Sequence, residues 1–212
     1  MQLKNLFLSF GFWLAWLVAA AQNVHQLGPN YYSAGLPSEK ISQYASKGKQ
    51  KHENWCWAAC IQTVLNYHGL GVTQEQVVER SVGDLVDVPG GPHEMMRSLN
   101  GVIYSPENGY TRVSATYGST SAREIRNYLA HDNPLIVGLS VPGQRTGHAY
   151  VLSAIYYKLD NRGNVIPEKV VLRDPWPYGP SRQEISWKEF AYRVNSIYKV
   201  QVKELGKKVA VN

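Results

Sequence analysis

The first strong regularity in this chain is a helical spacing of apolar positions that begins at Trp55. Apolar residues recur there three or four positions apart, at Ala58, Ala59, Ile61, Val64 and Leu65. Gly69 follows, and glycine is common just after the last turn of a helix. The spacing therefore predicts a helix from Trp55 to Gly69 with one apolar face turned toward a core.

Later helices are marked by their first residues rather than by long apolar stripes. Thr73 with Gln76, and Ser121 with Glu124, have the spacing of a capping box. We expect a helix to begin at each of these two places. A shorter helix is expected over residues 95–99, after a loop rich in glycine and proline.

After Pro134 the period changes to one typical of strands. Runs rich in β-branched and aromatic residues cover residues 135–141, 148–157, 169–174 and 197–202. A polar segment around Asn161 separates the second run from the third, which predicts a hairpin. Helices first and strands afterwards indicate an α+β fold, with a helical N-terminal lobe and an antiparallel β lobe.

The N-terminal residues follow the pattern of a secretory signal peptide. Lys4 gives a positive charge, residues 6–18 are apolar, and Ala19-Ala20-Ala21 supplies the small residues that signal peptidase requires. The apolar run is short for a membrane span of about 20 residues, which disfavours the alternative of a retained anchor. We expect residues 1–21 to be cleaved, leaving a secreted or periplasmic protein without a stable membrane anchor.

The mature chain, from Gln22, is expected to form one domain behind a short arm. Residues 22–49 are polar with scattered Gly, Pro and Ser, which predicts an extended N-terminal arm or loop, and residues 50–212 form the domain. The net charge of +6 falls to +5 (6 − 1) when the signal removes Lys4. The chain has no basic stripe interleaved with aromatic residues, so its sequence does not indicate a nucleic-acid partner. The sequence does not define an oligomeric state.

Cys56 and Cys60 are the only cysteines in the sequence. An oxidising compartment favours disulfides, but residues four apart in one predicted helix are poorly placed for a bridge. A free thiol there needs either burial or a function. Cys60 lies one turn further into the helix, and we expect it to be a core residue.

Cys56 occupies the first turn of the predicted helix, where the local field suits a nucleophile. The partial positive charge of a helix N-terminus favours the thiolate over the thiol. Backbone N–H groups of a first turn have no intrahelical acceptor, so they are free to stabilise an oxyanion. A buried structural cysteine remains the alternative for this segment taken alone.

Among the six histidines, His148 is the best candidate for the base that activates the thiol. It follows Thr146-Gly147 and opens an apolar strand, whereas the others lie at the cleavage site, at helix ends or in loops. His93 begins His-Glu-Met-Met-Arg, which lacks the second histidine of a zinc-protease helix. His52 precedes the helix, so it is expected at most to line the entrance to the site of Cys56.

The position of Asp174 follows from the predicted hairpin. If the chain turns about Asn161, Leu152 faces Val170 and His148 faces Asp174. Directly opposed residues have Cβ atoms about 5 Å apart, close enough for the carboxylate to orient the imidazole. The alternative is an ion pair at a sheet edge without a catalytic role.

Four segments in this order resemble a papain-like cysteine peptidase: Gln50, Cys56-Trp57-Ala58, Gly147-His148-Ala149 and Asp174-Pro175-Trp176. The compact bacterial members, including the C39-like and plant-pathogen effector types, are most similar. The resemblance implies a papain-like two-lobed catalytic domain with Cys56, His148 and Asp174 as the triad. It also implies Gln50 as an oxyanion donor and Trp176 as a shield for the imidazole.

This chain departs from the family pattern in ways that limit what the resemblance implies. Asp174 stands where the family usually has Asn, and Asn54-Trp55 precede the cysteine where plant papains have Gly-Ser or Gly-Ala. The segment before Gln50 is also shorter than the usual inhibitory prodomain. Substrate preference and zymogen control are therefore not implied.

Together these residues predict a secreted cysteine peptidase that hydrolyses peptide bonds through a thioester acyl-enzyme. The reaction requires no metal or cofactor, and the expected partner is a peptide or protein substrate. The same triad serves a peptidoglycan amidase, a transglutaminase or another acyltransferase, so these remain alternatives. A further alternative is a non-catalytic C39-like binding domain, which would have no need of all four positions together.

Overall fold

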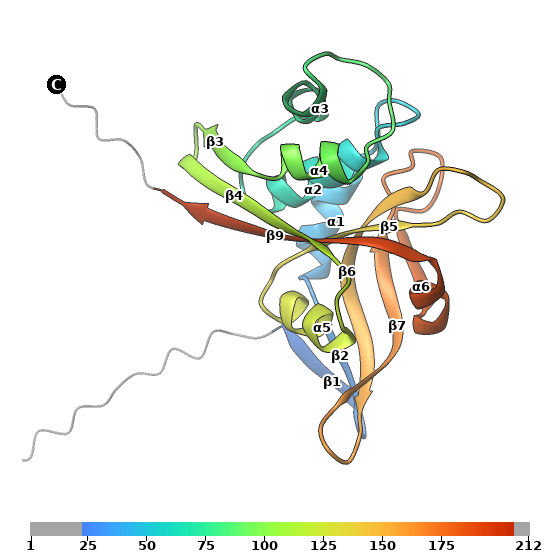
Figure 1. Cartoon of the computed structure of the whole chain (residues 1–212). Helices are drawn as coiled ribbons and strands as arrows, with labels where there is room; N and C mark the ends of the chain where they lie inside the picture. The colour runs from blue at the N-terminus through green and yellow to red at the C-terminus, as the bar shows by residue number, and fades with distance from the viewer. Residues whose placement is uncertain (1–22, 206–212) are drawn as a thin grey trace, which may run out of the picture.

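A computed structural model describes residues 23–205 of the chain (Figure 1). The expected signal peptide, residues 1–21, lies outside the described residues. In chain order the elements are β1 (Val24–Gly28), β2 (Tyr31–Gly35), α1 (Ser38–Lys47), α2 (Cys56–Tyr67), α3 (Gln74–Val82), α4 (Pro92–Ser98), β3 (Gly101–Ser105), β4 (Gly109–Gly118), α5 (Ala122–Ala130), β5 (Leu135–Leu139), β6 (His148–Leu159), β7 (Val165–Arg173), β8 (Arg182–Ser186), α6 (Trp187–Arg193) and β9 (Val194–Glu204).

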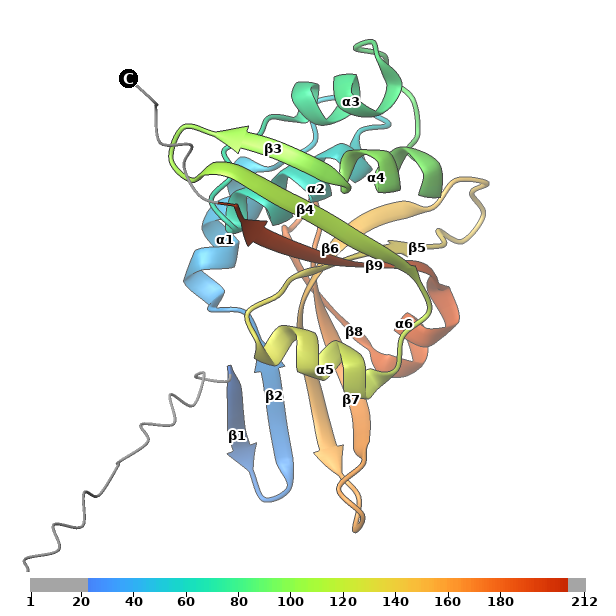
Figure 2. The same cartoon turned by 60° about the vertical axis from the view of Figure 1, so that its left-hand side comes forward.

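The strands within residues 23–205 form one antiparallel sheet. Its main order is β1-β2-β6-β5-β9-β4-β3, and β7 pairs with both β6 and β8. Strand β6 is the spine, because it pairs with β5 over residues 148–152, with β2 over 154–157, and with β7 over 151–159. Helices α2, α3 and α4 gather at one end of the sheet, and the β1–β2 hairpin lies at the other (Figures 1 and 2). The α+β prediction is confirmed.

Helix α2 is the centre of the core. Nine of its twelve residues are buried, and it packs against β6 as well as against α1, α3 and α4. Its apolar residues fill positions all round the helix, because neighbours cover it on several sides. The helix predicted from its spacing is confirmed, as are the capping boxes of α3, at Thr73 with Gln76, and of α5, at Ser121 with Glu124.

Residues 24–47, expected as an extended arm or loop, form two strands and a helix instead. The hairpin of β1 and β2 joins the sheet through β6, and Ala34 in β2 is fully buried. In α1, Ile41 is fully buried and Ala45 nearly so. The polar composition misled the prediction, because each element buries only a narrow face.

The hairpin of β6 and β7 was predicted at the wrong register. Leu152 faces Leu172 rather than Val170, and Val151 faces Arg173. The turn therefore lies one residue later than Asn161, and two bulges, one near Ser153 and one near Tyr157, shift the pairing and then restore it. The error is two residues, an even number, so His148 and Asp174 still project from the same face, as diagonal rather than opposed neighbours.

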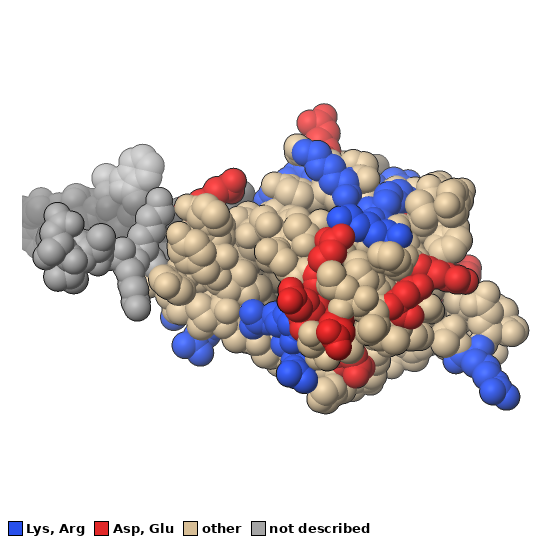
Figure 3. Space-filling model, turned by 90° about the horizontal axis from the view of Figure 1, so that it is seen from above, with Lys and Arg blue, Asp and Glu red and all other residues tan. Residues whose placement is uncertain are grey.

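Charged side chains of both signs are mixed over the helical end of the molecule. Viewed from above, Lys and Arg lie between Asp and Glu with no large area of one sign on that face (Figure 3). None of the helices in residues 23–205 has the length and apolar composition of a membrane span.

Candidate active site

Cys56 is the first residue of α2 and lies on the wall of a cleft of about 770 Å³. The first intrahelical bond runs from the Ala59 N–H to the Trp55 carbonyl, at 2.9 Å. The amides of the first turn, including that of Cys56, precede this bond and have no carbonyl one turn earlier to receive them. The half-buried sulfur therefore lies at the positive end of a buried helix, as the sequence predicted.

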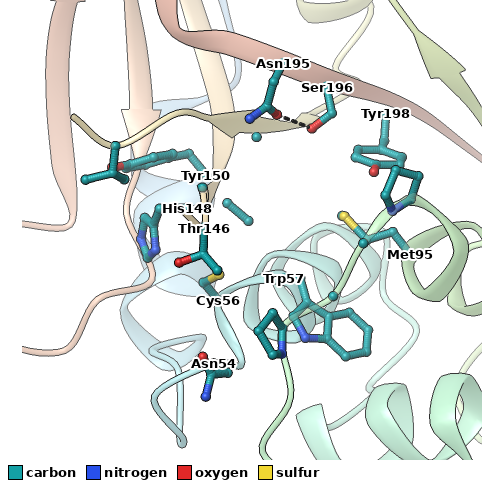
Figure 4. Close-up of a pocket in the computed structure, with 18 of the residues that line it drawn as sticks. Asn54, Cys56, Trp57, Met95, Thr146, His148, Tyr150, Asn195, Ser196 and Tyr198 are labelled. Atoms are coloured by element: carbon teal, nitrogen blue, oxygen red, sulfur yellow. Dashed lines mark hydrogen bonds between the residues drawn. The ribbon is translucent and has the colours of Figure 1, made fainter. Parts of the chain in front are cut away.

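His148 and Asp174 are joined directly. The imidazole Nε2 lies 2.8 Å from Oδ1 of Asp174, and the two side chains are only 18% and 9% exposed. Gly147 has no room for a side chain, since a Cβ there would lie 2.9 Å from the Leu139 carbonyl oxygen. The start of β6 thus passes close to β5, and this brings the imidazole to the cleft beside Cys56 (Figure 4).

The protonation of His148 reflects a competition between burial and its partners. Burial lowers the pKa of the imidazole, but hydrogen bonds to Asp174 and to the Cys56 sulfur, together with their charges, raise it to about 9 from an ordinary 6.5. Because Nε2 faces Asp174, Nδ1 is the ring nitrogen left for the sulfur. The arrangement places an imidazole of raised pKa between the Cys56 sulfur and the Asp174 carboxyl group.

Asp174 receives two further hydrogen bonds. Its Oδ1 also accepts from the Trp176 N–H at 2.8 Å, and its Oδ2 accepts from Nε2 of Gln183 at 2.7 Å. Gln183 lies in β8 and was not predicted as a site residue. The local pattern of β8 alternates half-buried and exposed residues without any motif, so only the strand pairing reveals this contact.

Gln50 is buried, but its amide does not reach the cleft. Nε2 donates to the carbonyls of His52 and Glu53, at 2.9 and 2.8 Å, and Oε1 has no hydrogen-bond partner. Gln50 is not among the residues that line the cleft. In this arrangement the side chain shapes the loop that leads into Cys56, and its role as an oxyanion donor stays a prediction.

The segment that contains Gln50 is tied to the loop after β7. The Gln50 N–H donates to the Pro175 carbonyl at 2.9 Å. The ammonium of Lys49 donates to the carbonyls of Asp174, Trp176 and Gly179, at 3.2, 2.6 and 3.4 Å. Because the two segments come from different lobes, these bonds fix the Asp174 loop against the approach to the nucleophile.

The residues around Cys56 also hold the loop that forms the opposite wall. The Asn54 N–H donates to Oδ1 of Asp87 at 2.9 Å. The indole N–H groups of Trp55 and Trp57 donate to the carbonyls of Val86 and Val88, at 2.8 and 3.1 Å. A Cβ at Gly90 would overlap the Trp57 indole, so the loop lies flat on this ring. The Asn-Trp-Cys-Trp segment therefore positions a wall of the cleft as well as the thiol.

The far end of the cleft is partly apolar. Met95 and Tyr198 lie together there, away from His148 and Cys56, with the Trp57 indole below them and Ser196 and Asn195 above (Figure 4). Trp176 lines the cleft near Asp174 and is 38% exposed. The ring packed on His148 is that of Tyr150, edge-on at 4.7 Å, so a shielding role for Trp176 stays a prediction.

Cys60 is a core residue, as expected. It is 1% exposed, and both cysteines are free thiols. Burial raises the pKa of the Cys60 thiol well above its usual range, and the nearby charges of Cys56 and Asp174 add to the effect. Cys60 therefore stays protonated and unreactive beneath Cys56.

The other histidines lie away from this cleft. The ring of His52 packs on that of Trp55, with centroids 4.2 Å apart, and His93 contacts its neighbour Glu94 on the surface. Burial lowers the pKa of His68. Among residues 23–205, no group of three or more His, Cys, Asp or Glu is arranged to hold a metal ion.

Comparisons with known proteins agree with this architecture. The sequence pattern of the Peptidase_C39 like family matches residues 40–202. The solved peptidase domain of Streptococcus ComA, a bi-functional ABC transporter involved in a quorum sensing pathway, is 15% identical with a TM-score of 0.50, over 73% of this chain and 95% of that one. This similarity concerns the fold, and it confirms the papain-like prediction. None of the curated proteins matches the chain.

Two further solved structures are similar. A double glycine motif protease from an AMS/PCAT transporter, in complex with the leader peptide, is 16% identical with a TM-score of 0.45, over 74% of this chain and 89% of that one. The SERA5 proenzyme from Plasmodium falciparum is 10% identical with a TM-score of 0.49, over 81% of this chain and 66% of that one.

Proposed function

The chain belongs to the Peptidase_C39 like family and is a cysteine-type peptidase of papain-like fold; from this premise we propose that it is exported and cleaves peptide bonds with Cys56, His148 and Asp174. Cys56 is the nucleophile, His148 its base and acid, and Asp174 the partner of the base. The substrate is a peptide or a protein segment that lies extended along the cleft.

The observation that carries this proposal is the 2.8 Å bond between His148 Nε2 and Asp174 Oδ1 beside the first residue of α2. It orients the imidazole so that Nδ1 is left for the Cys56 sulfur. A His148 pKa of about 9 supports an imidazolium at neutral pH. In this proposal its partner is the Cys56 thiolate, which the N-terminal end of α2 favours.

Acylation uses both members of that pair. The thiolate of Cys56 attacks the carbonyl carbon, a C–S bond forms, and the carbonyl oxygen becomes an oxyanion. The imidazolium of His148 then gives its proton to the amine nitrogen, the C–N bond breaks, and the amine leaves. The product is a thioester between the substrate and Cys56.

Deacylation returns the enzyme to its starting state. His148, now neutral, takes a proton from water while the hydroxide attacks the thioester carbonyl. The C–S bond breaks, the acid product leaves, and the thiolate faces an imidazolium again. Asp174 stabilises that imidazolium throughout and keeps its ring in place.

Stabilisation of the oxyanion falls first to the amide of Cys56 at the helix N-terminus. Gln50, six residues earlier in the chain, is the second donor in this proposal. Because the amide does not reach the cleft in the observed arrangement, this role requires Nε2 to leave one of its two loop carbonyls, those of His52 and Glu53, and to turn toward the oxyanion. The cost of this exchange is small if the substrate replaces one bond with a charge-assisted one.

The proposal is tested by labelling the purified mature chain with an epoxide inhibitor of cysteine peptidases, followed by peptide mapping. We expect modification at Cys56 alone and cleavage of members of a peptide library, both absent from Cys56→Ala. An unlabelled Cys56, or a labelled enzyme that cleaves no peptide but hydrolyses a peptidoglycan amide or transfers acyl groups, would overturn it.

Export is tested separately. Expressed with its full sequence, the protein should be recovered outside the cytoplasm with a mass that corresponds to a chain beginning at Gln22. A chain that retains residues 1–21 and stays with the cell membrane would contradict export as a cleaved protein.

A further inference from the structure

The two oxygens of the Asp174 carboxylate are bound differently, and the proposed reaction accounts for only one of them. Oδ1 accepts from His148 and from the Trp176 N–H. Oδ2 accepts from the side-chain amide of Gln183, at 2.7 Å. Gln183 touches neither the cleft nor the reacting atoms, yet it completes the bonding of the group that holds the base.

The sheet places Gln183 where it can do this. It faces Leu172 across the β7–β8 pair, and Asp174 lies two residues after Leu172, on the same face. The Asp174 N–H donates to the Ser181 carbonyl at 2.6 Å, which extends the ladder beyond the end of β7. Both partners are therefore held by main-chain bonds of neighbouring strands.

Only one orientation of the Gln183 side-chain amide fits its contact with Asp174. An ionised carboxylate only accepts hydrogen bonds, so Gln183 presents its NH₂ group rather than its oxygen. The Asp174 side chain is 9% exposed, which leaves little water to replace a lost donor. Without Gln183, Oδ2 is left unsatisfied, and the carboxylate is free to rotate Oδ1 away from the imidazole.

We infer that Gln183 is a positioning residue that acts on catalysis through Asp174. It fixes the plane of the carboxylate and so directs Oδ1 at Nε2 of His148. This inference rests on the proposed function, because it matters only if His148 and Asp174 carry the reaction.

The first test is Gln183→Met, which keeps the length of the side chain and removes its donor. We expect kcat to fall about tenfold, as a small misorientation of a catalytic group does. KM should stay close to that of the wild type, because Gln183 does not line the cleft. The matched control is Gln201→Met in β9, whose exposed side chain donates to the Tyr128 hydroxyl at 3.5 Å, far from Asp174 in the sheet order, and which should behave as wild type.

The second test is Gln183→Glu, which keeps the shape and makes the donor depend on pH. Two adjacent carboxyl groups share a proton, because both cannot ionise easily at this distance. While the pair holds that proton, the introduced carboxyl group donates to Asp174 as the Gln183 amide does, and kcat should be close to wild type. As the pH rises and the pair loses its proton, kcat should fall in a step that wild type and Gln183→Met lack.

A residue that only fills space would leave the kcat of Gln183→Met at the wild-type value, whereas a carboxyl group introduced beside Asp174 changes the pH profile in either case. The inference is overturned if Gln183→Met keeps the wild-type kcat, or if Gln183→Glu does not recover that kcat while its pair with Asp174 holds the proton. It also fails if both variants are unfolded by circular dichroism, because Gln183 would then be a structural residue. If wild-type Cys56 neither labels nor cleaves peptides, the proposed function fails first, before any variant is compared.

Discussion

The two walls of the cleft are built differently. The wall that contains His148 and Asp174 consists of strand ends, and its polar groups bond to neighbouring strands and to Gln183. The opposite wall is the loop of residues 84–91, which is held by bonds from the Asn54 N–H and from the indole N–H groups of Trp55 and Trp57. Leu85 in this loop is 60% exposed.

This difference separates two tasks. Proton transfer tolerates little displacement, and its groups lie where main-chain ladders set their positions. Contact with a substrate tolerates more, and a loop fastened by a few side chains can adjust to it. Changes on the strand wall should therefore act on kcat, and changes on the loop wall should act on KM.

The largest effect is expected where the two walls meet, at the nucleophile. Cys56→Ala should abolish turnover with the fold intact, because alanine suits the helix and lacks only the sulfur. Cys60→Ala should keep most of the activity and lower the free energy of unfolding, since it leaves a small void in the core. Peptide turnover and thermal melts of both variants test this. An inactive, folded Cys60→Ala beside an active Cys56→Ala would reverse the assignment.

The strand wall is tested next, at Asp174. Asp174→Ala should lower kcat about 10³-fold, whereas Asp174→Asn should retain much more activity because its oxygen still accepts the His148 bond. A His148 pKa of about 9 keeps the imidazolium present below that pH and loses it as the pH rises through 9. Removing the carboxylate charge lowers this pKa, so the alkaline limb of the Asn variant should move to lower pH. Equal rates and unmoved limbs in both variants would exclude Asp174 from the triad.

Gln50 lies in the loop that leads into Cys56, and its variant decides between two roles. Gln50→Ala should lower kcat about 10²–10³-fold with little change in the alkylation rate of Cys56, as expected for the loss of one oxyanion donor. Kinetics with peptide and with iodoacetamide measure the two effects. If alkylation slows in parallel, the bonds to His52 and Glu53 are what matters, and Gln50 positions the loop before Cys56.

The smallest effect on the chemical step is expected on the loop wall. Gly90→Ala places a Cβ against the Trp57 indole, so the loop must move outward. We expect KM to rise several-fold with kcat nearly unchanged, and the free energy of unfolding to fall by about 1–3 kcal/mol. Gly71→Ala is a control for added bulk, because no atom lies within 4 Å of its Cβ position, although its positive φ adds strain. A fall in kcat without a rise in KM at Gly90→Ala would remove the distinction between the walls.

The sequence sufficed for the elements whose signals are local. Helix α2 was visible from its spacing, and α3 and α5 from their capping boxes. Strand β4 was missed although its burial alternates, because two of the buried positions are Gly109 and Thr111 and dilute the apolar pattern. Local patterns identify an element only when its buried face is also apolar.

The site depends on longer-range relations, and these were predicted unequally. His148 and Asp174 belong to one hairpin. The register error was an even number of residues, so both side chains were still placed on the correct, shared face of the sheet. Gln183 follows a connection with prolines at 175, 177 and 180. This connection is not a simple turn, so the register of β7 against β8 could not be counted from the sequence. The hydrogen bonds from the Gln50 amide to the carbonyls of His52 and Glu53 depend on the conformation of a loop, and no sequence pattern encodes that conformation.

Strand β6 has a consequence for how this protein loses activity. Residues 151, 152 and 154–157 are paired on both edges, so their amides should be among the slowest in the chain to exchange with deuterium. His148 begins this strand, and Cys56 begins the helix that packs on it. The reacting pair therefore belongs to the part of the molecule that opens last, and heat inactivation should follow global unfolding, while fraying of the hairpin tips leaves turnover intact.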